Sequence, residues 1–118
     1  MAQKLDEESV QRLAERAQAA VETGSSDAAN RVVIAVIGRD RTGILAGVTG
    51  IMARRAANIL DVSQTTMSDL FVMIMLVDIE RINVTFADLK QELEEHGRRE
   101  ALSIIIQHEE IFRAMHRI

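Results

Sequence analysis

Residues 32–43 read Val-Val-Ile-Ala-Val-Ile-Gly-Arg-Asp-Arg-Thr-Gly, and this stretch decides the fold. Its apolar half, Val32 to Ile37, runs into a polar turn bracketed by Gly38 and Gly43. An apolar run bounded by glycine predicts a strand that is buried on both faces. The turn leads into a helix start, where free backbone N–H groups and the positive end of the dipole can hold a carboxylate. The turn is therefore a candidate small-molecule site.

The spacing of Gly38 and Gly43 matches that of the two glycines in a nucleotide-binding P-loop. However, Ile44 and Leu45 stand where that motif has Lys and Ser or Thr. Without a Lys for the phosphates and a hydroxyl for Mg²⁺, the nucleotide interpretation fails. The dinucleotide motif G-x-G-x-x-G is also absent from the sequence. The turn is predicted to be a polar cradle that carries no catalytic group.

From Arg31 onward the pattern predicts strand, helix, strand, strand, helix, strand. The helices are expected at about 43–56, with Thr42 as the N-cap, and at 85–96, with Gly97 as the C-cap. The other elements are strands 58–67 and 70–79 joined by a tight turn, a last strand at 101–107 and a short helix at 108–118. This βαββαβ order predicts an α+β, ferredoxin-like sandwich. Both main helices should cover one face of an antiparallel four-stranded sheet of order 2-3-1-4.

Three short motifs carry a family resemblance: Gly38-x-Asp40-x-x-Gly43-Ile44-Leu45, Asn58-Ile59, and Asp61-Val62-Ser63-Gln64. Together they resemble an ACT domain, and more closely the small stand-alone ACT proteins of bacteria related to the glycine-cleavage repressor type. The similarity covers residues 31–118, including the ending Ala-Met-His-Arg-Ile at 114–118. It implies a dimer that binds an amino acid or related metabolite between its subunits.

The expected ligand-binding residues combine the turn with the start of the second strand. Asn58 is expected to lie beside the turn, and the resemblance implies that it bonds the bound amino acid. Asp40 either accepts a hydrogen bond from a ligand ammonium or fixes the loop through an Asx-type turn. Arg39 and Arg41 fit solvated loop charges better than carboxylate clamps. The full expected set is Gly38, Arg39, Asp40, Thr42, Gly43, Ile44, Asn58, Ile59 and Asp61.

Composition indicates one compact domain and excludes several classes. At 118 residues, with 47% hydrophobic content, a single domain with its own core is expected. No apolar segment approaches the roughly 20 residues that span a membrane, and the polar N-terminus is no signal peptide. The absence of cysteine excludes disulfides, thiol catalysis and cysteine-ligated metals, and a cytoplasmic location is expected. The net charge of −4 gives no electrostatic reason to bind nucleic acid.

Residues 1–30 are expected to form a separate N-terminal helical extension and linker, and residues 31–118 the ACT-like domain. Good helix formers run from Asp6 to Val21, with a thin apolar stripe at Leu5, Val10, Leu13, Ala17 and Val21. The polar stretch 23–30 then predicts a helix stop and a flexible linker. Two interpretations of the extension stay open: a frayed or loosely docked appendage, or an arm that packs on a partner subunit.

Two patterns predict a homodimer. Residues 70–77 are apolar on both alternations, so both faces of the sheet there need a cover. The main helices cover one face, which leaves the other to the terminal helix, with Ile111, Phe112 and Met115, or to a second subunit. On the first helix, Gly43, Gly47 and Gly50 lie opposite the apolar side. Because mid-helix glycines cost about 1 kcal/mol each against alanine, we expect close packing there, within or between chains.

Three classes of function compete. The leading one is a dimeric metabolic sensor, a regulatory module that binds an amino acid or related metabolite and acts on an enzyme or a regulator protein. The alternative is a ligand-free protein–protein interaction module. An enzyme is not expected, because no nucleophile–base pair, metal set or acid/base dyad stands out; His108 and His116, with Glu109 and Glu110 nearby, are too weak a pattern for a metal site. No cofactor, nucleic acid or membrane partner is expected, and the chain has too few aromatic residues to bind RNA through its sheet.

Overall fold

The computed structural model describes residues 30–115, and residues 1–29 and 116–118 lie outside the described part. The predicted N-terminal extension therefore falls almost wholly outside it. The elements follow one another as β1 (Arg31–Arg39), α2 (Ile44–Arg54), β2 (Asn58–Met67), β3 (Leu70–Asp78), α3 (Phe86–Glu100), β4 (Ser103–His108) and α4 (Glu109–Met115).

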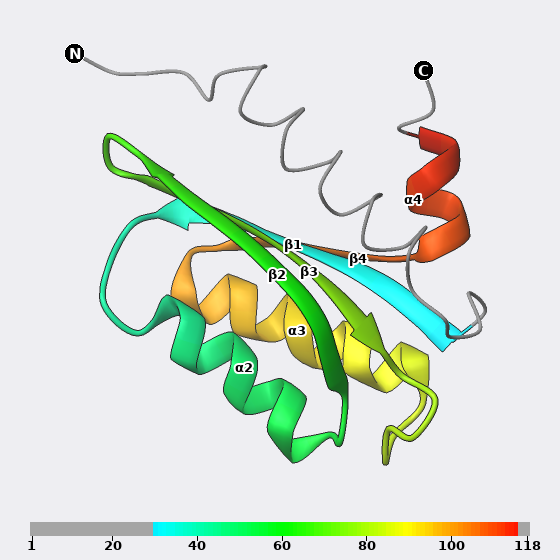
Figure 1. Cartoon of the computed structure of the whole chain (residues 1–118). Helices are drawn as coiled ribbons and strands as arrows, with labels where there is room; N and C mark the ends of the chain where they lie inside the picture. Colours follow the sequence, from blue (N-terminus) through cyan, green and yellow to red (C-terminus); the bar gives the residue numbers. More distant parts are fainter. Residues whose placement is uncertain (1–29, 116–118) are drawn as a thin grey trace.

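The four strands form one antiparallel sheet with the order β2-β3-β1-β4. Helices α2 and α3 lie side by side on one face of this sheet, and α4 lies on the other (Figure 1). The ferredoxin-like fold and the strand order are confirmed. We call the two surfaces the helix face, covered by α2 and α3, and the second face.

Strand β1 is central because both of its edges are paired. Val36 pairs with Met73 of β3 and with Ile104 of β4, and its own side chain is 0% exposed. The strand runs on through Gly38, which the sequence placed in the turn, because Gly38 pairs with Phe71. A Cβ at Gly38 would lie 2.5 Å from Leu102 Cδ2, so the glycine permits the close approach of Leu102.

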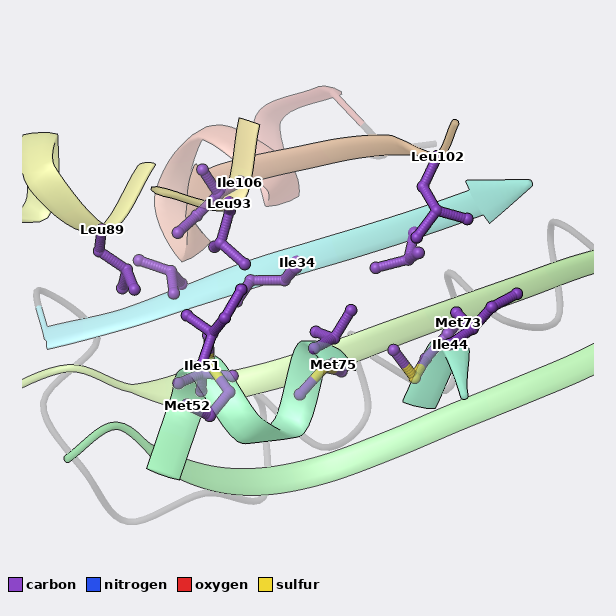
Figure 2. Packing of buried hydrophobic residues seen from close by; sticks show 14 of the residues in the cluster. Ile34, Ile44, Ile51, Met52, Met73, Met75, Leu89, Leu93, Leu102 and Ile106 are labelled. Atoms are coloured by element: carbon purple, nitrogen blue, oxygen red, sulfur yellow. The ribbon is translucent and has the colours of Figure 1, made fainter. Parts of the chain in front are cut away.

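The main core lies between the helix face and the two long helices. Its side chains alternate along β1 and β3 and meet one stripe from each helix, as Figure 2 shows. Val48 of α2 and both Leu89 and Leu93 of α3 are 0% exposed. The cluster comprises Val32, Ile34, Val36, Ile44, Val48, Ile51, Met52, Phe71, Met73, Met75, Val77, Leu89, Leu93, Leu102 and Ile106.

The helix boundaries differ from the predictions at their caps. Thr42 is not the N-cap of α2, since Gly43 takes that position and no side chain caps the helix. Helix α3 continues past Gly97 to Glu100 and ends at Ala101, which has a left-handed φ of 56°. Gly97 lies inside the helix because a Cβ there would come within 2.7 Å of the Leu102 carbonyl oxygen. Its role is close packing of α3 against the following chain.

The two long helices meet through polar contacts as well as through the core. A Cβ at Gly47 would lie 3.0 Å from two ring atoms of His96, so this glycine gives the close packing expected of it within one chain. Near the end of α2, Arg55 Nε donates to Glu92 Oε1 of α3 at 2.6 Å. That hydrogen bond, with the charge of Glu92, raises the pKa of Arg55.

The second face carries a smaller apolar cluster of Val33, Val72, Ile74, Leu76 and Phe112. Phe112 of α4 is 6% exposed, as expected for a covering residue, whereas Ile111 and Met115 are 51% and 64% exposed. A buried ion pair holds the base of α4, because Arg31 Nη2 of β1 donates to Glu109 Oε1 at 3.1 Å. The side chains of Arg31 and Glu109 are 4% and 0% exposed. Within the described part, no helix is both long and apolar enough to cross a membrane.

Candidate functional site

The loop between β1 and α2 ends in a helix start without a side-chain cap. Gly43 has φ 94° and ψ −5°, a left-handed conformation that favours glycine. The backbone N–H groups of Ile44, Leu45 and Ala46 have no partner within the helix, since the first helical bond runs from the Gly47 amide to the Gly43 carbonyl. Such groups form hydrogen bonds with anions, and the helix dipole adds to the attraction. This end of the loop can therefore hold a carboxylate.

Two contacts fix the loop in place. The Asp40 amide donates to the Asp69 carbonyl at 2.6 Å, which seats the loop on the turn between β2 and β3. Arg41 Nη2 donates to the Glu100 carbonyl at 2.6 Å, at the end of α3. Arg41 is thus engaged with the end of α3, whereas the sequence analysis favoured a solvated loop charge.

The remaining loop side chains are exposed and differ in what they offer. Arg39 lies 3.9 Å from Asp69, and both side chains are at least 75% exposed, so the pair contributes little. Asp40 and Thr42 are exposed as well. For their carboxylate and hydroxyl groups we find no hydrogen bond within the described part of the chain. Both are available to a ligand, whereas Ile44 is buried in the core and contributes its backbone alone.

Asn58 lies at the far end of the sheet from this loop, so the expectation that it lies beside the loop is wrong within one chain. Asn58 pairs with Asp78, which pairs in turn with Arg31 at the start of β1. The loop follows the end of β1, roughly 30 Å away along a ten-residue strand. Sequence motifs give neighbours along the chain, but only the strand register shows at which end of the sheet each one lies.

A polar depression of about 400 Å³ surrounds Asn58. It is lined by Ala56, Asn58, Asp78, Glu80 and Arg81. The Asp78 carboxylate accepts from the Glu80 amide at 2.8 Å and so shapes the turn after β3. The sequence analysis missed Asp78, Glu80 and Arg81, because they follow β3 and reach Asn58 only through the pairing of β2 with β3.

The other two residues expected at this end serve the strand itself. Ile59 packs against the main core on the helix face. Asp61 follows an irregularity in the pairing of β2 with β3, and its carboxylate accepts from the Val62 amide at 3.0 Å. Of the predicted set, the structure thus groups Arg39, Asp40, Thr42 and Gly43 at one end of the sheet and Asn58 at the other.

A second depression, of about 380 Å³, lies between α3 and the edge strand β4. Its lining combines apolar side chains, among them Ile104, Ile106 and Ile111, with the charged side chains of Lys90 and Glu94. Phe86 stacks on His108 at its side, with ring centroids 4.4 Å apart. Among the described residues there is no group of three or more side chains placed to bind a metal ion.

Comparison with known proteins identifies the same unit. The sequence model of a family described as the ACT domain matches residues 30–107. A UPF0237 protein of Methanocaldococcus jannaschii is 57% identical over 89 residues, which are 75% of this chain and 99% of that protein. The solved ACT domain protein from Streptococcus pneumoniae is 36% identical, with a TM-score of 0.61, and the match covers 70% of this chain and 92% of that one. The structure of a candidate glycine cleavage system transcriptional repressor shares the fold at 23% identity and a TM-score of 0.59, over 65% of this chain and 44% of that one.

Proposed function

The chain belongs to the ACT-domain family, and from that premise we propose that it is a dimeric sensor of an amino acid or a related small metabolite. ACT domains are typically regulatory modules that bind ligands, and the described residues hold no constellation typical of an enzyme. The ligand would bind between two subunits, and binding would favour one form of the dimer over another.

The separation of the two half-sites along the edge strand β2 carries this proposal. The β1–α2 loop is seated on the turn that follows β2, whereas Asn58 is the first residue of β2. Strand β2 is an edge of the sheet, so its outer backbone groups are available to a second strand. A two-fold axis that pairs two copies of β2 antiparallel brings the start of one strand beside the end of the other. Asn58 of the partner subunit then lies next to the loop, and two equivalent sites form.

The chemistry of the joined halves suits a zwitterion. The ligand carboxylate would accept hydrogen bonds from the free N–H groups at the start of α2. Its ammonium would donate to oxygens of Asp40 and of Asn58 of the partner subunit. Because these contacts come from both subunits, ligand binding stabilises the dimer arrangement that makes them. This is a physical route from ligand binding to a change in affinity for a regulated enzyme or regulator protein.

Sedimentation and a ligand screen test the proposal in sequence. At micromolar concentration the protein should sediment with about twice the chain mass of 13.1 kDa. A thermal-shift screen across the amino acids should give a hit, and calorimetry should then confirm its affinity. A monomer at that concentration overturns the proposal, because the half-sites of one chain cannot meet.

Substitution at each half-site then tests the geometry. Asn58→Ala should lower affinity roughly 5- to 150-fold, the equivalent of about 1–3 kcal/mol for a lost polar contact. Gly43→Val should weaken binding further through backbone strain at positive φ, since a Cβ there meets nothing within 4 Å. Gln91→Ala, which removes an exposed amide from α3, is the control and should leave affinity unchanged. Unchanged affinity in both site variants, with both folded, places the ligand elsewhere.

A ligand-free interaction module is the second candidate. The depression between α3 and β4 favours it, because Ile105 and Ile111 beside it are about half exposed and β4 is the other edge of the sheet. A negative ligand screen together with a stable dimer would favour this alternative.

A further inference from the structure

The second face of the sheet also carries a row of apolar side chains on its two central strands. On β1 it presents Val33, Ala35 and Ile37, and on β3 Leu70, Val72, Ile74 and Leu76. Helices α2 and α3 both lie on the opposite side (Figure 1). Among the described elements, α4 is the helix on the second face. The question is therefore how much of this surface α4 can cover.

Helix α4 covers one end of the second face. It begins directly after His108, which pairs with Val32 near the start of β1. Its seven residues make a helix of about 10 Å. Val72 pairs with Ile37 at the other end of β1, roughly 13 Å along β3 from Leu76. Helix α4 therefore leaves the half of the face around Val72 to another cover.

Two side chains of β3 in that half are nevertheless almost closed to solvent, although Ala35, Ile37 and Leu70 beside them are only partly buried. Val72 is 3% exposed and Ile74 is 8% exposed. Flanking side chains of the same sheet shield the sides of these residues, but a side chain that stands on a sheet needs a layer above it to lose nearly all its exposure. The described helices supply no such layer over Val72.

The chain outside the described residues has the length and the sequence pattern for this role. The described part starts at Asn30, whose carbonyl accepts from the Ile79 amide, and Arg31 then joins β1 to the base of α4. The described chain thus begins at the end of the sheet that carries α4. If residues 6–21 are helical they span about 24 Å, close to the length of β1. The stripe Leu5, Val10, Leu13, Ala17 and Val21 supplies a single apolar side.

We propose that residues 5–21 dock on the second face as an amphipathic helix, beside α4 and over Val72 and Ile74 of the same chain. This docking makes the sandwich three-layered and closes the face against a second copy, so that the edge strand β2 is left for the dimer. The family match begins at residue 30, so the docked segment is an addition of this chain to the shared domain.

Cysteine accessibility in the full-length chain tests the docking, because the native sequence has no cysteine. A Val72→Cys variant should react with a small thiol reagent at least tenfold more slowly than an Ile105→Cys variant, whose position is 50% exposed. Adding Leu13→Asp to Val72→Cys should raise its rate at least tenfold, because a carboxylate cannot lie on an apolar face. Adding Gln11→Asp, off the apolar stripe, is the matched control and should leave the rate unchanged.

Two outcomes overturn the proposal. One is an unchanged Val72→Cys rate after Leu13→Asp, in a protein whose thermal melt remains cooperative. The other is protection that disappears on dilution below the dimer's dissociation constant, because the cover is then a second copy. If Leu13→Asp abolishes the cooperative melt, Leu13→Ala is combined with Val72→Cys instead. The thiol reaction should then speed up by a smaller factor. An unchanged reaction rate contradicts the docking. Every measurement in this test concerns the second face and none uses a ligand. A failed ligand screen would therefore overturn the proposed sensor function without affecting the docking proposal.

Discussion

The two faces of the sheet are held to their helices by different physical means, although the same strands supply both. On the helix face, α2 and α3 bury side chains such as Val48, Leu89 and Leu93 completely, in a cluster without charge. On the second face, α4 brings Phe112 and a buried ion pair between Arg31 and Glu109. The helix face therefore gains its stability from many apolar contacts, whereas the position of α4 depends on a few specific ones.

The largest effect should come from the ion pair. Glu109→Gln leaves the Arg31 guanidinium buried without its counter-charge, which costs about 4 kcal/mol of unfolding free energy. Denaturant unfolding measures it, and Glu110→Gln, at the exposed neighbouring position, should change stability by less than about 0.5 kcal/mol. Equal stabilities of the two variants would show that α4 is held by Phe112 rather than by charge.

A cavity on the helix face should have the next largest effect. Leu93→Ala removes a 0% exposed side chain between α3 and the sheet and should cost about 3 kcal/mol. Ile105→Ala, at a half-exposed position of β4 on the second face, should cost about 1 kcal/mol or less. Chemical denaturation measures both losses of unfolding free energy. Equal losses in Leu93→Ala and Ile105→Ala would show that the two faces of the sheet do not differ in packing.

Added volume tests how tightly α3 lies on the chain that follows it. Gly97→Ala would bring a Cβ within 2.7 Å of the Leu102 carbonyl oxygen, a backbone atom that cannot move aside cheaply. We expect a loss of about 1–3 kcal/mol, measured by thermal unfolding. A neutral result would mean that the turn at Ala101 adapts.

The smallest effect should be a gain. A Cβ at Gly50 would meet only Arg54 Nη1, the end of a flexible side chain, at 3.4 Å. Gly50→Ala should therefore stabilise the fold by about 0.5–1 kcal/mol through helix propensity. If the same variant also weakens the proposed dimer in sedimentation, this side of α2 lies at the subunit contact. Close packing between chains then explains why a glycine is kept there.

The order of elements was predictable from the sequence because apolar periodicity and turn residues reflect local geometry. The hairpin around Ser68 and the apolar strand at 70–77 left few other topologies for a chain of this length. Helix caps were less predictable: Ala56 and Ala101 take left-handed φ values of 59° and 56°, a conformation that favours glycine. Conversely, Gly97 was mistaken for a cap, because its packing against Leu102 involves a backbone contact that leaves no periodic signal.

Only parts of the candidate site were predictable. The composition of the loop, with Asp40, Thr42 and Gly43 before a helix, indicated an anion-binding turn from local sequence. The position of Asn58 depends on the direction of β2, which is parallel to β1 because both pair antiparallel with β3. That relation is a property of the whole sheet, so the family motif suggested a contact that a single chain does not make.

The central position of β1 also affects how the protein is made. β1 is the first strand of the sheet to emerge during synthesis, yet Val36 pairs with Met73 and Ile104, which follow much later. Until both partners appear, the apolar run Val32 to Ile37 is an unpaired strand of the kind that aggregates in nascent chains. Arg31 and Arg39 flank it at either end. Charges in these positions act as gatekeepers, so the two arginines protect the growing chain before either takes part in the finished fold.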